Sequence, residues 1–162
     1  MQPNLIIRHK IYLAVVCVIF FAIGLLRLND LTIYTPDSSR YLIFANSLAH
    51  GNGFVDNTQP EPDMFSVQAP LYPIILIPSQ LIFPFSLEAA KIWTLLWGIL
   101  AVILFYRLIL NFGNRRVALG ASIMFAFNPL TFIYSTEVLS EAPFISFLFI
   151  TFLWLDRKID DK

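Results

Sequence analysis

The sequence predicts an all-α membrane protein with about four transmembrane helices. The chain of 162 residues is 57% apolar and only 14% charged, and its mean hydropathy is +0.70. These values lie outside the usual range of soluble domains. Its apolar runs approach the ~20 residues that a helix needs to cross a bilayer. The net charge is zero, so nothing favours a nucleic acid as a partner.

Four apolar segments are expected to span the membrane: residues 11–28, 92–112, 117–135 and 138–155. The first follows a basic tail but lacks a small-x-small cleavage site, so we interpret it as an uncleaved helix rather than a signal peptide. The third carries no charge between Arg116 and Glu137. Cys17 lies inside the first segment and has no second cysteine to pair with, so it is expected to be a packing residue.

The positions of the cations predict the orientation of these helices. Arg115 and Arg116 fall between the second and third spans, and Arg157 and Lys158 follow the fourth. Because cytoplasmic loops carry an excess of Lys and Arg, these residues and the basic N-terminal tail predict that both termini are cytoplasmic. Residues 30–87 then form an external loop.

The end of that loop, residues 71–87, is apolar enough to enter lipid but contains Pro73, Pro78 and Pro84. Each proline removes a backbone donor, and a fifth span here would move the paired arginines to the outside. We therefore expect an interfacial or re-entrant element, in which broken helix is tolerated against protein. The chain as a whole, residues 1–162, is expected to be a single membrane module.

An amphipathic helix is predicted at the start of the external loop. Thr35 is a candidate N-cap, Pro36 suits the first helical position and Asp37 then lies in the first turn. Gly51 is a natural stop. An apolar face at helical spacing joins Tyr41, Phe44, Ala45 and Leu48. Asp37 either complements the helix dipole, worth ~0.3–1 kcal/mol, or takes part in chemistry.

A second acidic cluster, Glu137 and Glu141, lies near the outer end of the third and fourth spans. Glu137 is interpreted as a solvated acid that caps the end of a helix. Glu141 is followed at once by Ala-Pro-Phe-Ile, which draws it toward the membrane, where acids are functional candidates. Asp37 and Glu141 would serve as a general base or hold a divalent cation against a phosphate. Arg40, one turn after Asp37, would form a helix salt bridge or meet a lipid phosphate.

Five short motifs follow one another along the chain. They are Pro36-Asp37 with Arg40-Tyr41, Gly51-Asn52-Gly53-Phe54, Pro70-Leu71-Tyr72-Pro73, the Arg115-Arg116-Val-Ala-Leu turn, and Leu139-Ser140-Glu141-Ala-Pro-Phe. Over residues 10–160 this order resembles the N-terminal part of the C-type (GT-C) membrane glycosyltransferases. The similarity is greatest to the dolichyl-phosphate-mannose:protein mannosyltransferase-like and aminoarabinose-transferase-like families of bacteria.

The resemblance implies transfer of a hexosyl or pentosyl group from a polyprenyl-phosphate-linked donor to a lipid, glycan or protein acceptor. The reaction would take place at the outer face of a bacterial inner membrane. Asp37 and Glu141 would be the catalytic residues, the first as a base or metal-supporting carboxylate and the second near the donor phosphate or the acceptor. The residues implied in substrate binding are Arg40, Tyr41, Tyr72 and Glu137. A divalent cation is the one cofactor that the resemblance suggests.

Two departures from the family pattern leave alternatives open. The basic residue that usually precedes the Pro-x-Tyr-Pro corner is missing from Val67-Gln68-Ala69. Family members also have many more spans, so we expect a fragment, a truncated gene product or a small partner that keeps only the catalytic-loop module, with the remaining helices of a longer enzyme as its partner. The alternatives are a non-catalytic scaffold or assembly protein and a transporter fragment with Glu141 in an ion path. Few polar residues lie in mid-span, whereas acids gather at one face, which favours the enzyme.

Overall fold

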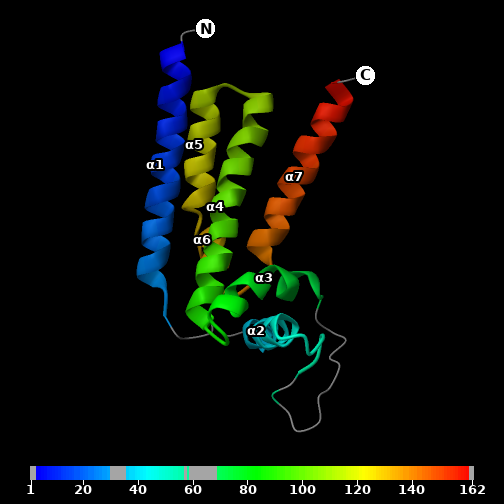
Figure 1. The fold of residues 1–162 in the computed structure, drawn as a ribbon. Helices are drawn as coiled ribbons and strands as arrows, with labels where there is room; N and C mark the ends of the chain where they lie inside the picture. The colour runs from blue at the N-terminus through cyan, green and yellow to red at the C-terminus, as the bar shows by residue number, and fades with distance from the viewer. Residues whose placement is uncertain (1–2, 30–35, 57, 59–68, 161–162) are drawn as a thin grey trace.

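The computed structural model describes residues 3–29, 36–56, 58 and 69–160, and these form seven helices. Helices α1, α4, α5 and α7 stand side by side, while α2 and α3 lie across one end of the bundle (Figure 1). Both termini and the turn between α4 and α5 lie at the opposite end. The helix bounds are α1 Pro3–Arg27, α2 Pro36–Ala49, α3 Leu71–Ile82, α4 Leu87–Phe112, α5 Arg115–Ala126, α6 Pro129–Thr136 and α7 Glu141–Asp160.

Two of the described helices, α1 and α4, are long and apolar enough to cross a bilayer. The α5–α6 pair makes a third span if its two bent parts cross together. These helices confirm the all-α membrane class. The fourth expected span, 138–155, falls on α7, whose last turns carry Asp156, Arg157 and Lys158. Helix α7 has 20 residues but is not among the described helices that are both long and apolar enough to cross a bilayer, so a fourth crossing stays a prediction.

The expected third span, 117–135, is wrong as a single helix, because α5 and α6 meet at an angle of 62°. Pro129 begins α6 and cannot donate a backbone hydrogen bond, and the residue before a proline avoids helical geometry. Asn128 is extended and caps α6, its side-chain oxygen accepting from the Leu130 N–H at 2.9 Å. The Asn-Pro pair is a turn signal that the sequence contained.

Two other expected boundaries also shift. Helix α4 begins at Leu87 rather than residue 92, because Ser86 caps it and accepts a hydrogen bond from the Ala89 N–H at 3.2 Å. Helix α7 begins at Glu141 rather than residue 138. Glu137 and Glu141 therefore do not share one helix, since α6 ends at Thr136 and Glu137 follows it as the C-cap.

Helix α2 follows its local sequence signals. It begins at Pro36 with Asp37 in the first turn, although the expected cap Thr35 lies outside the described residues. It ends at Ala49, and the chain turns at Gly51, whose φ of +78° is the left-handed conformation that glycine adopts freely. The Gly51 N–H donates to the Leu48 carbonyl and the Asn52 N–H to the Ser47 carbonyl, which closes the last turn.

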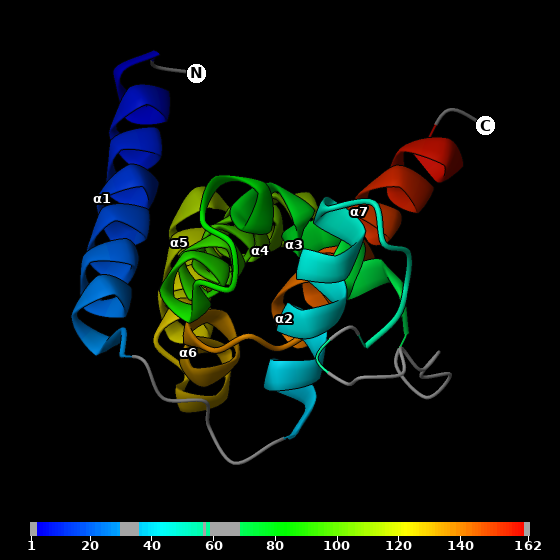
Figure 2. The ribbon, with the colours of Figure 1, turned by 60° about the horizontal axis from the view of Figure 1, so that its bottom comes forward.

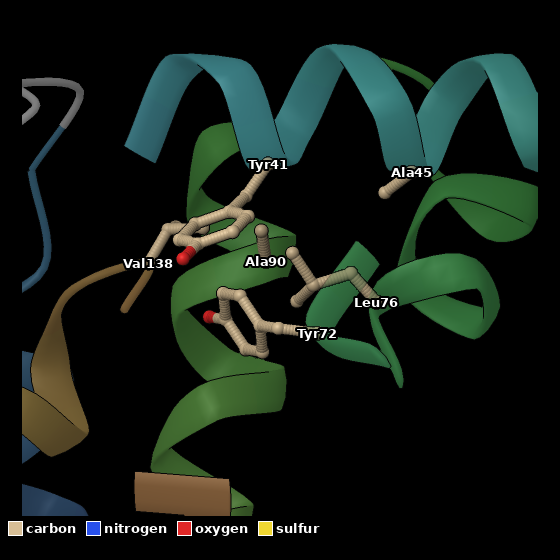
Figure 3. Packing of buried hydrophobic residues seen from close by; sticks show 6 residues of the cluster. All are labelled: Tyr41, Ala45, Tyr72, Leu76, Ala90 and Val138. Carbon is tan, nitrogen blue, oxygen red and sulfur yellow. The ribbon is translucent and has the colours of Figure 1, made fainter. Parts of the chain in front are cut away.

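Helix α3 has 12 residues and rises only ~18 Å, which is too short for a hydrocarbon core of ~30 Å. It packs against α2 across the end of the bundle (Figure 2). The Tyr41 and Tyr72 rings meet edge to face with centroids 4.8 Å apart. Figure 3 shows the buried cluster that joins α2 and α3 to the bundle: Tyr41, Ala45, Tyr72, Leu76, Ala90 and Val138.

Candidate functional site

A cavity of about 430 Å³ lies at the end of the bundle that α2 and α3 cover. This volume falls within the range of small-molecule sites, ~300–1,000 Å³. Its walls come from α2, from α3 with the residues just before it, and from the start of α7. They are mostly apolar: Tyr41, Ala69, Leu71, Tyr72, Ile75, Ser140, Glu141, Pro143, Phe144 and Phe147.

Glu141 supplies the one charged side chain among these lining residues. It occupies the first turn of α7, where the helix dipole favours a carboxylate. The side chain is half-buried, and its Oε2 atom is fully buried with no hydrogen-bond partner among the described residues. Buried polar atoms in folded proteins are nearly always paired. An unpaired carboxylate oxygen in a cavity therefore marks Glu141 as a candidate ligand-binding group.

Tyr72 forms a fixed wall beside Glu141. Its hydroxyl lies 2.7 Å from Thr94 Oγ1, and the Thr94 hydroxyl donates to the Ala90 carbonyl at 2.9 Å. Tyr72 is therefore the donor to Thr94. Burial raises the pKa of the Tyr72 phenol, and nearby Tyr41 and Glu141 raise it further, outweighing the hydrogen bonds that lower it. Tyr72 remains a neutral donor at physiological pH.

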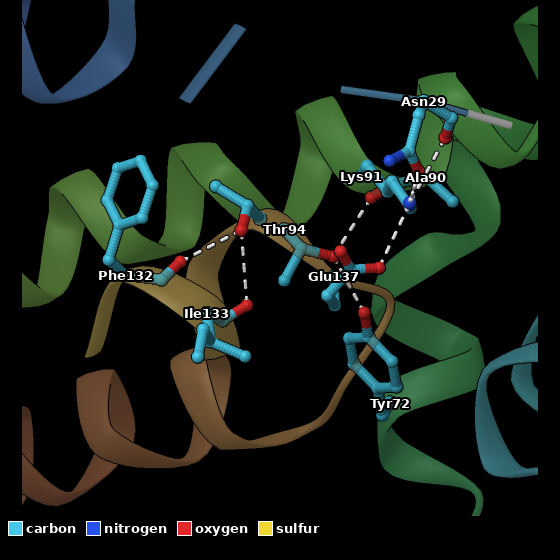
Figure 4. Close-up of polar contacts among 9 residues, drawn as sticks. Asn29, Tyr72, Ala90, Lys91, Thr94, Phe132, Ile133 and Glu137 are labelled. Carbon is cyan, nitrogen blue, oxygen red and sulfur yellow. Dashed lines mark hydrogen bonds and ion pairs between the residues drawn. The ribbon is translucent and has the colours of Figure 1, made fainter. Parts of the chain in front are cut away.

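A buried ion pair lies behind this wall, between Lys91 of α4 and Glu137 of the α6–α7 turn (Figure 4). Lys91 Nζ is 3.0 Å from Glu137 Oε2, and the two side chains are only 1% and 3% exposed. Lys91 Nζ also donates to the carbonyl and side-chain oxygens of Asn29, at 3.1 and 3.0 Å. The pair thus ties the end of α1 and the start of α4 to the segment that precedes Glu141.

The interpretation of Glu137 as a solvated capping acid is therefore wrong. The carboxylate is buried because Lys91 offers it a charged partner, and burial of an acid otherwise carries a large desolvation cost. Glu137 does not line the cavity. Lys91 was not predicted as a site residue. It lies between Leu87-Glu88-Ala89-Ala90 and a long apolar run, and a lysine is almost never buried without a paired acid or acceptor.

The structure brings three of the predicted site residues together at the cavity: Tyr41, Tyr72 and Glu141. Asp37 and Arg40 do not line it. Asp37 is half-buried in the first turn of α2, and Tyr41 follows it by one turn on the same helix. The helix that carries Asp37 therefore contributes directly to a cavity wall.

The donor set for a metal ion is incomplete. No group of three or more His, Cys, Asp or Glu side chains gathers as a metal site within the described parts of the chain. Glu141 brings one carboxylate to the cavity. Magnesium typically binds one or two carboxylates together with substrate phosphates. Glu141 is therefore the residue that would hold such an ion, with a phosphate completing its ligands.

Fold and site together define an integral membrane protein with an acid-bearing apolar cavity at one end of a helical bundle. A sequence model of the dolichyl-phosphate-mannose-protein mannosyltransferase family matches residues 67–162. The match covers more than half of the chain, and the protein belongs to this family of membrane glycosyltransferases. The matched residues include Tyr72, Lys91, Glu137 and Glu141 but not helix α2. Neither curated proteins nor solved structures gave a match.

Proposed function

We propose that this chain forms the donor- and acceptor-binding end of an enzyme that transfers a hexosyl or pentosyl group from a polyprenyl-phosphate-linked sugar. The acceptor is a lipid, a glycan or a protein. The observation that carries the proposal is the unpartnered, buried Glu141 oxygen in a cavity with apolar walls. Membership of a mannosyltransferase family supports the reaction class.

The chemistry of the cavity suits a lipid-linked sugar. Leu71, Ile75 and Phe144 offer apolar contacts to a prenyl chain, while Glu141 and the neighbouring Ser140 offer polar contacts to the sugar-phosphate end. Leu71 and Phe144 are 56% and 65% exposed, so this apolar wall continues onto the outside of the bundle. A prenyl chain would enter along that surface from the membrane.

In the proposed reaction the acceptor oxygen or nitrogen attacks the anomeric carbon of the sugar. The bond from this carbon to the phosphate oxygen breaks, and polyprenyl phosphate leaves with the electron pair. Asp37 takes the proton from the acceptor group, and Glu141 supports the phosphate side. A bare carboxylate repels a phosphate, so a positive charge must lie between them. We propose that Arg40, or a divalent cation shared by Glu141 and the phosphate, supplies it.

The function is tested in membranes from cells that express the complete gene, with membranes from a deletion strain as the control. We expect a radiolabelled polyprenyl-phosphate sugar to lose its label to an endogenous acceptor with release of polyprenyl phosphate. A nucleotide sugar should give no direct transfer. Addition of a chelator reports on the divalent cation. Equal label transfer in the deletion strain would refute the enzyme proposal and favour a non-catalytic scaffold.

We propose a bacterial inner-membrane location with both termini cytoplasmic and the Glu141 cavity outside. Both termini and the α4–α5 turn lie at the same end of the bundle, which supports an even number of membrane crossings (Figure 1). In a Cys17→Ser background, Asn52→Cys should react with a membrane-impermeant maleimide added to intact cells, whereas Gly113→Cys should react only after permeabilisation. Both positions are exposed. Reaction of the Gly113→Cys variant in intact cells would refute this orientation.

A further inference from the structure

Both termini and the α4–α5 turn lie at the end of the bundle opposite α2 and α3 (Figure 1). A second and larger cavity, of about 830 Å³, is lined by residues next to that turn, on α1 and near the end of α7. It is bounded by α1, α4, α7 and the first residue of α5. Neither the family match nor the proposed reaction assigns it a role. Polar and apolar side chains line it: Lys10, Leu13, Ile103, Tyr106, Arg107, Leu110, Asn111, Arg115, Leu153, Asp156 and Arg157.

The charged groups at this cavity are strongly unbalanced. Four of its lining residues are cationic, namely Lys10, Arg107, Arg115 and Arg157, and Asp156 is the single carboxylate. Asp156 is already engaged, because it accepts a hydrogen bond from Asn111 Nδ2 at 2.6 Å. None of the four cations forms an ion pair with a residue that the structure describes. The cavity therefore carries an excess of positive charge.

Arg115 gives the most direct sign of a missing anion. Its Nη1 atom is buried and has no hydrogen-bond partner among the described residues. A buried guanidinium nitrogen without a partner is costly. Arginine presents a planar set of donors that matches the oxygens of a phosphate. The unpaired donor thus points to a phosphate as the class of ligand.

We propose that this cavity binds the phosphate of an anionic phospholipid from the leaflet at the end of the bundle that carries both termini. Basic pockets between transmembrane helices typically bind such headgroups. The apolar lining residues Leu13, Ile103 and Leu153 distinguish a lipid from free phosphate, because they offer contact to the glycerol and the acyl chains. The bound lipid would hold α7 to α1 and α4.

Adjacent arginines provide a matched test of this site. Arg115 lines the cavity, whereas Arg116 does not and is exposed. Arg157 and Lys158 form a second such pair, with Lys158 over the Trp154 ring instead. If lipid binding came only from general attraction to an anionic membrane surface, all four residues would contribute to it equally. If the lipid binds in the cavity, only the cavity-lining residue of each pair, Arg115 or Arg157, is required.

The purified protein in detergent is titrated with phosphatidylglycerol, with phosphatidylcholine and with inorganic phosphate at matched ionic strength, and bound lipid is counted by native mass spectrometry. We expect one phosphatidylglycerol to bind selectively. Arg115→Gln and Arg157→Gln should each weaken this binding about fivefold, the effect of one charge near an anionic lipid. Arg116→Gln and Lys158→Gln should change it less than twofold.

Circular dichroism checks that each variant keeps its helix content. Equal losses in all four variants, or equal binding of phosphatidylcholine, would overturn the proposal. Full competition by millimolar inorganic phosphate would show a phosphate site without a lipid requirement and would overturn the choice of ligand. None of these readings depends on sugar transfer.

Discussion

Asp37→Asn is expected to lower the initial rate of sugar transfer by roughly 10²–10⁴-fold, the usual contribution of a positioned general base. Glu141→Gln is expected to lower it by roughly 10²–10³-fold, the usual cost of removing one group that stabilises charge in the transition state. In the proposed reaction, Asp37→Asn removes the group that takes the acceptor proton. Glu141→Gln removes the negative charge that would balance a cation at the donor phosphate. The rate is measured as release of polyprenyl phosphate in membranes that contain the complete gene product.

Because Glu141 Oε2 has no partner in the described structure, glutamine breaks no ion pair there, and the yield of folded protein should stay unchanged. Glu88→Gln is the matched control, since Glu88 occupies the first turn of α4 as Glu141 does in α7 but is exposed. If Asp56→Asn loses transfer while Asp37→Asn keeps it, we have assigned the wrong base. If neither Asp37→Asn nor Glu141→Gln lowers the rate of sugar transfer, the enzyme proposal is refuted and a non-catalytic scaffold is favoured.

Lys91→Met is expected to lower the free energy of unfolding by about 3–5 kcal/mol, the cost of leaving one member of a buried ion pair without its partner. The substitution keeps the aliphatic stem but leaves the buried Glu137 side chain, 3% exposed, without a cation. The measurement is chemical unfolding in detergent, followed by tryptophan fluorescence.

The double variant Lys91→Met/Glu137→Leu tests the origin of that loss. Replacing a buried pair by apolar residues of similar size is often neutral, so the double variant should be more stable than Lys91→Met alone. Arg116→Met, which removes an exposed cation, serves as the control and should change stability by less than about 0.5 kcal/mol. A loss below about 1 kcal/mol in Lys91→Met would contradict the buried pair.

Local signals in the sequence were sufficient to predict helix α2 and to single out Glu141, which the structure places at the cavity. Pro36 and Gly51 act through their own backbone geometry, so no distant contact is needed to place the helix between them. Glu141 stood out because apolar residues follow it. The all-α membrane class followed from hydropathy alone, since every spanning backbone group in lipid must be paired internally.

The buried pair could not be predicted in the same way. Lys91 meets Glu137 and Asn29 only through tertiary packing, and Asn29 lies 62 residues away along the chain. Periodicity describes the face of one helix and carries no information about such partners. The break at Asn128-Pro129 differs, because its signal was local. The long uncharged run around it outweighed that signal in the prediction.

The 62° bend between α5 and α6 has a consequence for the bilayer itself. With α5 upright, its 12 residues rise ~18 Å, and the 8 residues of the tilted α6 add only ~6 Å. If both parts cross the bilayer, a span of that height falls short of the ~30 Å hydrocarbon thickness, and local thinning of the membrane is one way to relieve such hydrophobic mismatch. Thinning on this side of the bundle would draw the headgroup layer inward. The phosphate of a lipid-linked sugar would then meet the Glu141 end of the protein without leaving its own leaflet.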